Sequence, residues 1–210
     1  MPDRNAPLTA ADLDTLAWEK MDGLLPAVVQ DADTRQMLML AYLNPEALAA
    51  TLESGFVTFF SRSKQRLWQK GETSGNRLAL RSIHPDCDGD SLLILALPEG
   101  PTCHLGTPSC FAEGGPEGVG WLGLLARIVR DRASADPEQS YTARVLSEGQ
   151  ARIAQKVGEE GVEVALAAVT RDEQGLTEEV ADLLYHLTVL MRARGTDWDQ
   201  VASVLRDRHA

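Results

Sequence analysis

A glycine-rich segment near the middle of the chain separates two halves that differ in hydrophobic period. Residues 112–120 contain four glycines and one proline, a composition typical of a linker. Before this segment, short runs rich in aromatic and β-branched residues alternate with turn signals, which predicts strands. After it, every segment has a helical period. The sequence therefore predicts two domains, at 1–112 and 121–210.

The first half has the elements of a mainly-β domain. A short helix is expected where Thr9 and Asp12 form a capping box, and a second helix begins after Asn44 and ends near Ser54. Residues 31–35 read as the turn of a hairpin. The expected strands cover residues 24–30, 36–42, 56–61, 67–70, 77–83 and 91–97. This half is therefore predicted to be an α+β domain in which strands predominate.

The second half is expected to be all-helical, because apolar residues recur there with helical spacing and no strand pattern is present. The first expected helix begins near Trp121, the second follows the cap Ser140, and the third carries the apolar stripe of residues 153–169. The fourth follows the cap Thr177 and ends near Arg194, and the fifth follows the cap Thr196 and ends near Arg208. The predicted fold class is thus α+β, with a mainly-β N-terminal domain followed by an all-α domain.

One stretch of the first half combines soft and hard metal ligands. It contains all the cysteines of the chain and three alternating aspartates: Asp86, Cys87, Asp88, Asp90, Cys103 and Cys110. Thiolates suit zinc and carboxylates suit magnesium. If residues 86–90 are extended, the aspartates point to one side and Cys87 to the other. The pattern predicts zinc on the three cysteines and magnesium on the three aspartates.

Three thiolates would leave the fourth zinc position open, as in catalytic zinc sites. The alternative is that the cysteines are small buried hydrophobic residues. It fits Cys103 and Cys110 less well, because neither lies in an apolar run. An EF-hand loop is excluded, since Ser91 stands at the position of the glycine and Leu97 at that of the closing glutamate.

Basic residues gather between positions 62 and 81, at Arg62, Lys64, Arg66, Lys70, Arg77 and Arg81. The net charge of −11 argues against general nucleic-acid binding, so this local cluster indicates a small phosphorylated ligand. The loop 71–76 is rich in Gly, Ser and Thr, and its N–H groups could hold an anion. A solvated strand face with an ordinary hairpin loop remains the alternative.

The second half carries two pairs of carboxylates at helical spacing. Glu160 and Glu163 share one helical face, and Glu179 and Asp182 share another. If the two helices pack antiparallel, the four carboxylates converge and magnesium would neutralise them. Two solvated acidic faces are the alternative.

Three segments of the first half, 68–76, 86–90 and 100–111, resemble the signature of phosphoribosyl-AMP cyclohydrolase, and the likeness runs from about Leu24 to Phe111. The carboxylate pairs resemble the signature of the all-helical nucleotide pyrophosphohydrolases. Residues 140–142 and 155–160 are similar to the branch that acts on phosphoribosyl-ATP. The two families are known to occur fused, as a bifunctional enzyme of histidine biosynthesis.

The resemblance implies that the second half hydrolyses phosphoribosyl-ATP to phosphoribosyl-AMP and pyrophosphate. The first half would then open the adenine ring of phosphoribosyl-AMP with zinc-activated water, and His104 would shuttle the proton. It also implies a homodimer with the zinc site shared between subunits. The expected substrate-binding residues are Arg62, Lys64, Trp68, Lys70, Gly71, Glu72, Thr73, Ser74, Gly75 and Asn76.

The expected location is the cytoplasm, without a membrane partner. No apolar stretch reaches the roughly 18 residues of a membrane span, the N-terminus lacks the apolar core of a signal peptide, and unpaired cysteines suit a reducing compartment. Two other functions stay open. One is a general nucleotide pyrophosphatase joined to a non-catalytic zinc module. The other makes the first half a metal-storage or redox-sensing protein, although three cysteines without a close pair fit a sensor poorly.

Overall fold

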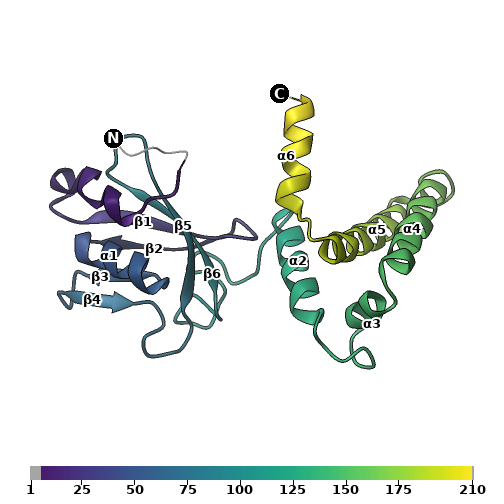
Figure 1. The fold of residues 1–210 in the computed structure, drawn as a ribbon, viewed down its shortest axis with the longest axis horizontal. Coiled ribbons are helices and arrows are strands. Elements are labelled where there is room, and N and C mark those ends of the chain that lie inside the picture. The colour runs from purple at the N-terminus through teal and green to yellow at the C-terminus, as the bar shows by residue number, and fades with distance from the viewer. Residues whose placement is uncertain (1–5, 210) are drawn as a thin grey trace. The chain divides into compact units, whose positions relative to one another are not determined.

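The computed structural model describes residues 6–209. The chain divides into two compact units, and the boundary along the sequence falls between Gly120 and Trp121 (Figure 1). The first is rich in strands and the second is helical, which confirms the predicted α+β class. The expectation about a signal peptide concerns the extreme N-terminus, and residues 1–5 lie outside the described part.

A four-stranded sheet of order β2-β1-β6-β5 organises the N-terminal unit. Its strands are β1 (Leu25–Asp31), β2 (Met37–Leu43), β5 (Leu78–Pro85) and β6 (Leu92–Pro98). The pairs β1–β2 and β5–β6 are antiparallel, whereas β1 and β6 run parallel. The turn between β5 and β6 therefore lies at the end of the sheet where β1 begins. The start of β2 and the segment that follows β6 lie at the opposite end.

Helix α1 (Pro45–Ser54) begins and ends where the sequence predicts. The Asn44 side chain accepts a hydrogen bond of 2.9 Å from the backbone N–H of Ala47, and Gly55 ends the helix with a φ of 71°. The remaining elements of this unit are the 3-10 helices η1 (Ala10–Thr15) and η2 (Trp18–Met21) and the paired strands β3 (Thr58–Ser61) and β4 (Arg66–Gln69).

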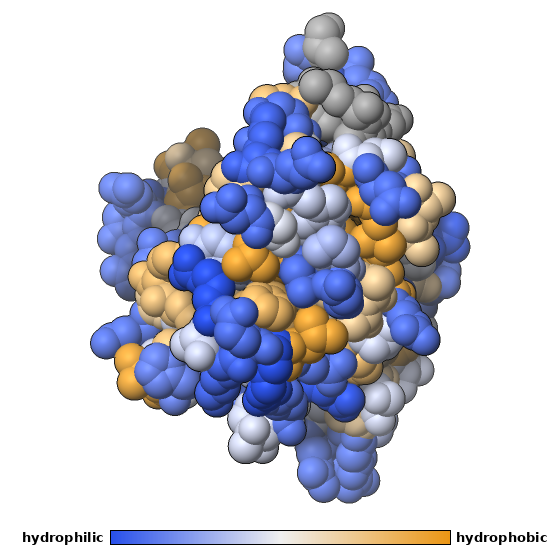
Figure 2. Space-filling model, turned by 90° about the vertical axis from the view of Figure 1, so that its left-hand side faces the viewer, coloured by the Kyte–Doolittle hydropathy of each residue, from blue (hydrophilic) through white to orange (hydrophobic). Residues whose placement is uncertain are grey.

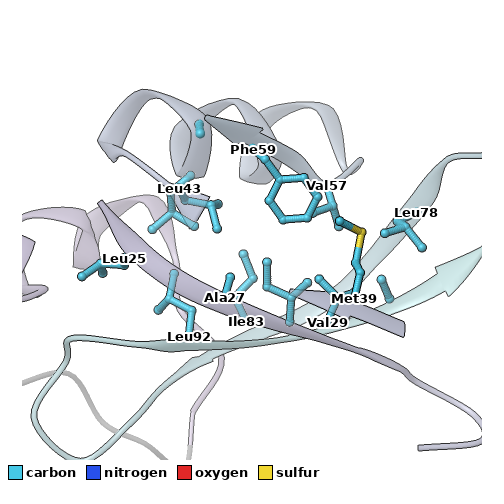
Figure 3. Packing of buried hydrophobic residues seen from close by; sticks show 14 of the residues in the cluster. Leu25, Ala27, Val29, Met39, Leu43, Val57, Phe59, Leu78, Ile83 and Leu92 are labelled. Carbon is cyan, nitrogen blue, oxygen red and sulfur yellow. The ribbon is translucent and has the colours of Figure 1, made fainter. Parts of the chain in front are cut away.

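The core of this unit lies between the sheet and the layer formed by α1, β3 and β4 (Figure 3). Alternate residues of β1 point into it, among them Leu25 and Val29, and Phe59 of β3 packs above them. Each large apolar side chain removed from water in this way contributes roughly 1.5–3 kcal/mol to folding. On the outer face shown in Figure 2, hydrophilic residues predominate around scattered hydrophobic ones, as is ordinary for a water-exposed surface.

The second unit consists of α2 (Gly120–Arg132), α3 (Tyr141–Ser147), α4 (Gln150–Thr170), α5 (Glu173–Arg194) and α6 (Trp198–His209). Only two residues connect α4 to α5, so the two long helices form an antiparallel hairpin. A small core of Leu125, Val129, Val145, Ile153 and Val189 joins four of the helices. None of the helices in the described part has the length and apolar character that a membrane crossing requires.

The predicted short N-terminal helix is present as a 3-10 helix, with its capping box between Thr9 and Asp12. Two other local predictions were wrong. Helix α5 begins at Glu173, whereas the predicted start was Glu178, after the cap Thr177. Its N-cap is Asp172, whereas the Thr177 hydroxyl donates to the Glu173 carbonyl inside the first turns. Before α6, the side chain that accepts from the Gln200 N–H, at 2.8 Å, is that of Asp197 and not of Thr196.

Candidate active sites

A cavity of about 390 Å³ lies at the end of the sheet where β2 begins. One part of its lining is the loop that follows β4, and another is the segment that follows β6. The cavity thereby joins two of the motifs on which the family resemblance rests. Predicted site residues that line it are Trp68, Lys70, Gly71, Glu72, Thr73, Ser74, Asn76, Cys103, His104 and Cys110.

Cys103 and Cys110 form a pair of thiols at this cavity. The Cys110 backbone N–H donates to the Leu38 carbonyl at 2.8 Å, which anchors this segment to the start of β2. Hydrogen bonds from the backbone N–H of Leu105 and from the Thr107 hydroxyl lower the pKa of the Cys103 thiol. Burial of the Cys110 thiol, and to a smaller extent the charge of the neighbouring Cys103, raises the pKa of Cys110. A soft metal that binds both sulfurs would stabilise both of them as thiolates.

His104 lies beside this thiol pair and is exposed to solvent. Its Nδ1 is 3.8 Å from the Cys103 Sγ. The imidazole therefore adjoins a candidate metal ligand and also lines the cavity in which a substrate would lie. This position suits a group that exchanges a proton with bound substrate.

The wall formed by residues 71–76 is a tight turn. Gly71 has a φ of 85°, and a Cβ at this position would lie 2.5 Å from the backbone of Asn76, so only glycine fits. Lys70 as a whole residue is 8% exposed, and its ammonium donates to the Asn76 carbonyl at 3.3 Å. Burial lowers the pKa of this ammonium. Its remaining hydrogen-bonding capacity is available to an anion in the cavity.

The basic cluster of the sequence is dispersed in the structure, and Lys70 is its member at the cavity. Arg62 stacks 3.8 Å from the centroid of the Tyr42 ring, and Arg66 forms a 2.5 Å ion pair with Glu72. That ion pair lowers the pKa of Glu72. Of the residues predicted to bind substrate, Arg62, Lys64 and Gly75 are not part of this cavity's lining.

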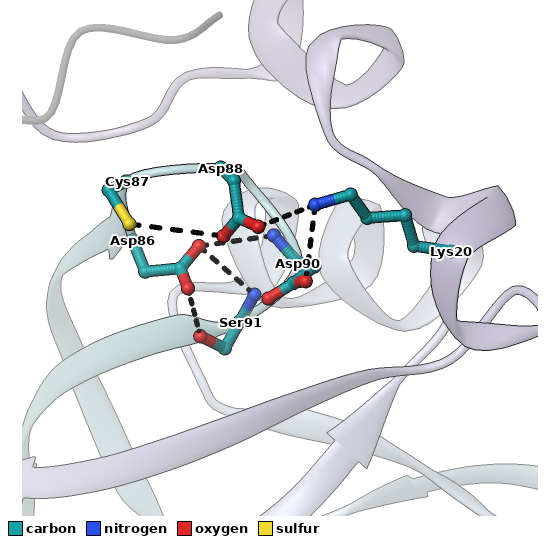
Figure 4. Close-up of polar contacts among 6 residues, drawn as sticks. All are labelled: Lys20, Asp86, Cys87, Asp88, Asp90 and Ser91. Carbon is teal, nitrogen blue, oxygen red and sulfur yellow. Dashed lines mark hydrogen bonds and ion pairs between the residues drawn. The ribbon is translucent and has the colours of Figure 1, made fainter.

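The aspartate-rich segment is a turn between β5 and β6, not an extended strand (Figure 4). The Asp86 carboxylate accepts the backbone N–H groups of Asp90 and Ser91, at 3.1 and 3.3 Å, and the Ser91 hydroxyl at 2.7 Å. Burial alone would raise the pKa of Asp86, but these hydrogen bonds together lower it. Gly89, with a φ of 74°, allows the chain to turn here.

The prediction that Cys87 points away from the aspartates was therefore wrong. Its Sγ lies 4.0 Å from an Asp88 carboxylate oxygen, and ligand atoms of Asp86, Cys87 and Asp88 all lie within 4.8 Å of one another. The Lys20 ammonium contacts Asp88 at 2.5 Å and Asp90 at 3.4 Å (Figure 4). A cation thus already bridges these two carboxylates, as a metal ion could.

Cys87 lies far from the other two cysteines of the same chain. It follows the end of β5, whereas Cys103 and Cys110 belong to the segment at the opposite end of the sheet. The seven residues of β6 between these ends span roughly 20 Å at about 3.3 Å per residue. Zinc–sulfur bonds of about 2.3 Å cannot bridge that span, so one chain cannot supply all three thiolates to one ion.

The carboxylates of the helical unit converge across the α4–α5 hairpin. One oxygen each of Glu160, Glu179 and Asp182 lies within 4.8 Å of the others. A hydrogen bond with Glu179, and then the charge of Glu160, raise the pKa of Glu163, so this carboxylate also adjoins the cluster. Glu160 and Glu179 are only 6% and 8% exposed. Two buried carboxylates beside two exposed ones, Glu163 and Asp182, form a donor set that a hard divalent cation would stabilise.

Basic groups partly offset this negative charge. The Lys156 ammonium lies 3.6 Å from a Glu160 oxygen and 3.0 Å from a Glu159 oxygen. Arg171, between the two helices, forms an ion pair with Glu179. Both cations lie at the edge of the cluster and would counter the charge of a phosphate bound there.

His186 also belongs to this site, and the sequence interpretation missed it. It is 5% exposed, and its Nδ1 lies 3.0 Å from the Asp182 carbonyl and 3.5 Å from a Glu160 oxygen. Because a carbonyl only accepts, Nδ1 carries the proton, and Nε2 accepts the Tyr141 hydroxyl at 3.2 Å. The available signal was its spacing, four residues after Asp182 on the same helical face.

Known proteins resemble both halves of the chain. The family model described as phosphoribosyl-AMP cyclohydrolase matches residues 39–112, and that described as phosphoribosyl-ATP pyrophosphohydrolase matches residues 122–209. The chain is 57% identical to the "Histidine biosynthesis bifunctional protein HisIE" of Escherichia coli strain K12 over 204 residues, which are 96% of this chain and 99% of that protein. Proteins of the same name from Salmonella typhimurium and Xanthomonas axonopodis pv. citri are 54% and 55% identical over 96% and 98% of this chain, and 99% and 98% of their own lengths.

Proposed function

The chain belongs to the family of bifunctional proteins of histidine biosynthesis. We propose that each of its two units carries out one of the two reactions. The chain is a phosphoribosyl-ATP pyrophosphohydrolase and a phosphoribosyl-AMP cyclohydrolase. In our proposal the helical domain, 121–210, releases pyrophosphate from phosphoribosyl-ATP. The N-terminal domain, 1–112, then adds water at C6 of the adenine and opens the N1–C6 bond.

The observation that carries the ring-opening assignment is the thiol pair of Cys103 and Cys110 beside His104, in a cavity that the loop 71–76 helps to line. When bound, zinc supplies the Lewis acidity that makes water a nucleophile near neutral pH. His104 takes a proton from the attacking water and returns it to the departing ring nitrogen. Lys70 and the N–H groups of the loop hold a phosphate of the substrate.

We propose that each zinc ion is held by two chains of a homodimer. Cys103 and Cys110 of one chain would be completed by Cys87 of a second copy. The roughly 20 Å between these positions within one chain supports this arrangement. The aspartates beside Cys87 would thereby reach the same cavity. Asp86, Asp88 and Asp90 would bind magnesium there, and Lys20 would give up its contacts with Asp88 and Asp90.

In the helical unit, Glu160, Glu163, Glu179 and Asp182 would hold magnesium against the phosphates of phosphoribosyl-ATP. The bound ion supplies charge neutralisation at the phosphate under attack. His186 orients Glu160 through Nδ1 and is itself held by the Tyr141 hydroxyl. All four carboxylates come from one chain, so this site needs no ligand from a second copy.

The proposed location is the cytoplasm. The three cysteines are all free in the structure, and a reducing compartment preserves thiols for metal binding. Small phosphoribosyl nucleotides are the only partners that the proposal requires besides the metals and a second copy.

Mixing two inactive variants tests the shared zinc site. Cys87→Ala and Cys103→Ala should each lose ring opening, because each removes a zinc ligand. In a mixed dimer, both defects fall on one site and the other site is intact. After dissociation and random reassociation, roughly a quarter of the wild-type ring-opening activity should return. A Cys103→Ala plus Cys110→Ala mixture is the control and should stay inactive, since both residues belong to the same half-site. If the first mixture also stays inactive, the shared site is wrong.

A further inference from the structure

The hydroxyl of Thr102 is buried and lacks a hydrogen-bond partner. Within the described residues, it is one of two buried side-chain polar atoms in this state. Thr102 is 3% exposed and lines the cavity of the N-terminal unit together with Cys103 and His104. Buried polar groups are nearly always hydrogen-bonded, because an unpaired one loses its interaction with water without compensation. The hydroxyl of Thr102 therefore needs an explanation.

Another buried threonine of the same unit follows the usual rule. The Thr51 hydroxyl donates to the Ala47 carbonyl at 2.8 Å and accepts the Thr58 N–H at 2.9 Å. It is 0% exposed, so burial alone does not deprive a threonine of partners in this fold. The difference is location, since Thr102 lines the cavity.

A second donor on the same cavity is also underused. The buried Lys70 ammonium has three N–H groups, and among the described residues the hydrogen bond it makes is to the Asn76 carbonyl, at 3.3 Å. Two donors with spare capacity on one cavity point to a ligand that supplies acceptors. Thr102 directly precedes Cys103 and His104 and lines the same cavity, whereas Lys70 adjoins the loop assigned to a phosphate.

We propose that the Thr102 hydroxyl donates a hydrogen bond to a nitrogen of the adenine ring of phosphoribosyl-AMP and orients C6 for attack by water. This inference rests on the ring-opening function proposed above. The hydroxyl is a substrate contact and takes no part in holding the fold. Its hydrogen bond forms only when substrate is bound, and the substrate-free protein carries the cost of its desolvation.

Thr102→Val tests this proposal, because valine keeps the shape of threonine and removes only the hydroxyl. We expect kcat/KM for added phosphoribosyl-AMP to fall about 10- to 100-fold, mainly through kcat, as for loss of one well-formed hydrogen bond. Zinc content and pyrophosphate release from phosphoribosyl-ATP should not change. The melting temperature of the substrate-free protein should stay the same or rise, because an unpaired polar group has been removed. Thr102→Ser should restore most of the lost activity.

Thr51→Val is the matched control. It removes a hydroxyl with two partners in the fold, so it should lower the melting temperature and leave the kcat of the folded protein near wild type. The proposal is overturned if Thr102→Val keeps wild-type kcat/KM, lowers the melting temperature as Thr51→Val does, or acts through KM alone. A serine variant as impaired as valine would also overturn it. If the wild-type protein opens no ring, the function itself is wrong, which is a separate result.

Discussion

Glu163 is a single residue at which the helical site can be tested. The hydrogen bond with Glu179 and the charge of Glu160 raise its pKa, while Lys156 acts in the opposite direction. With a raised pKa, the folded state binds this proton more tightly than the unfolded chain does. The contribution to stability is therefore fully present below the unfolded pKa of about 4.5 and is lost as the pH rises through the folded pKa.

Glu163→Gln should relieve this repulsion. In magnesium-free buffer at pH 7, the variant should melt at a higher temperature than wild type, and the difference should vanish near pH 4, where the carboxyl is protonated. Added magnesium should raise the melting temperature of wild type more than that of the variant, because the ion loses a ligand. Melting curves across pH, with and without magnesium, measure both effects. A pH-independent difference would show that Glu163 does not share the negative charge of the cluster.

The sequence identified the candidate metal ligands but not all of the side chains that lie beside them. Spacing alone placed Glu160 with Glu163 and Glu179 with Asp182, since a helix fixes which residues share a face. It did not reveal His186, because a lone histidine among apolar residues resembles an ordinary core residue. Nor did it separate Cys87 from Cys103, because positions close in sequence can lie at opposite ends of a hairpin.

Among the elements, the turn at 86–91 and the start of α5 show how local signals compete. Alternating aspartates resembled one face of a strand, but the Asp88–Gly89 pair is also a turn signal, and a left-handed Gly89 ends the strand. In α5, Asp172 and Thr177 are both good N-cap residues. Because Gly175, which lies between them, lowers the helix propensity of this segment, the sequence favoured a helix that begins after Thr177. The structure begins the helix at Glu173, and Arg171 just before it pairs with Glu179.

The two caps can be compared directly. Asp172 accepts the Gly175 N–H at 2.9 Å, so Asp172→Ala should lower the free energy of unfolding of the helical unit by about 1 kcal/mol. Thr177→Ala removes only a hydroxyl that donates to a carbonyl of its own helix, and its effect should stay within about 0.5 kcal/mol. Urea unfolding followed by circular dichroism measures both. Equal effects would mean that α5 has no defined start at Glu173.

For the whole molecule, most of the predicted architecture was right, because hydrophobic period, caps and the glycine-rich segment all indicated the same elements. The strands of the N-terminal half and the helix α1 lie within a few residues of their predicted positions. What the sequence did not supply was the parallel pairing of β1 with β6, which joins segments more than sixty residues apart. That pairing decides which end of the sheet carries each motif.

Two single changes should separate the two activities. Glu163→Gln should fail on phosphoribosyl-ATP and still open the ring of added phosphoribosyl-AMP. Cys103→Ala should release pyrophosphate and accumulate phosphoribosyl-AMP, because it removes a ligand from the other site. Chromatography that resolves both products measures this. If either change abolished both activities in a protein that remained folded by circular dichroism, the division between the units would be wrong.

The position of Cys87 at the far end of the sheet has a consequence for how the enzyme behaves on dilution. A fused chain fixes the numbers of the two catalytic units at one to one, but it does not fix the ratio of their activities. If ring opening needs two chains at each zinc ion, its rate falls with the square of the chain concentration once dimers dissociate. Pyrophosphate release, whose carboxylates all come from one chain, falls only in proportion. A dilution series should therefore turn a two-step enzyme into one that stops at phosphoribosyl-AMP, and the concentration at which the intermediate first builds up measures the affinity of one chain for another.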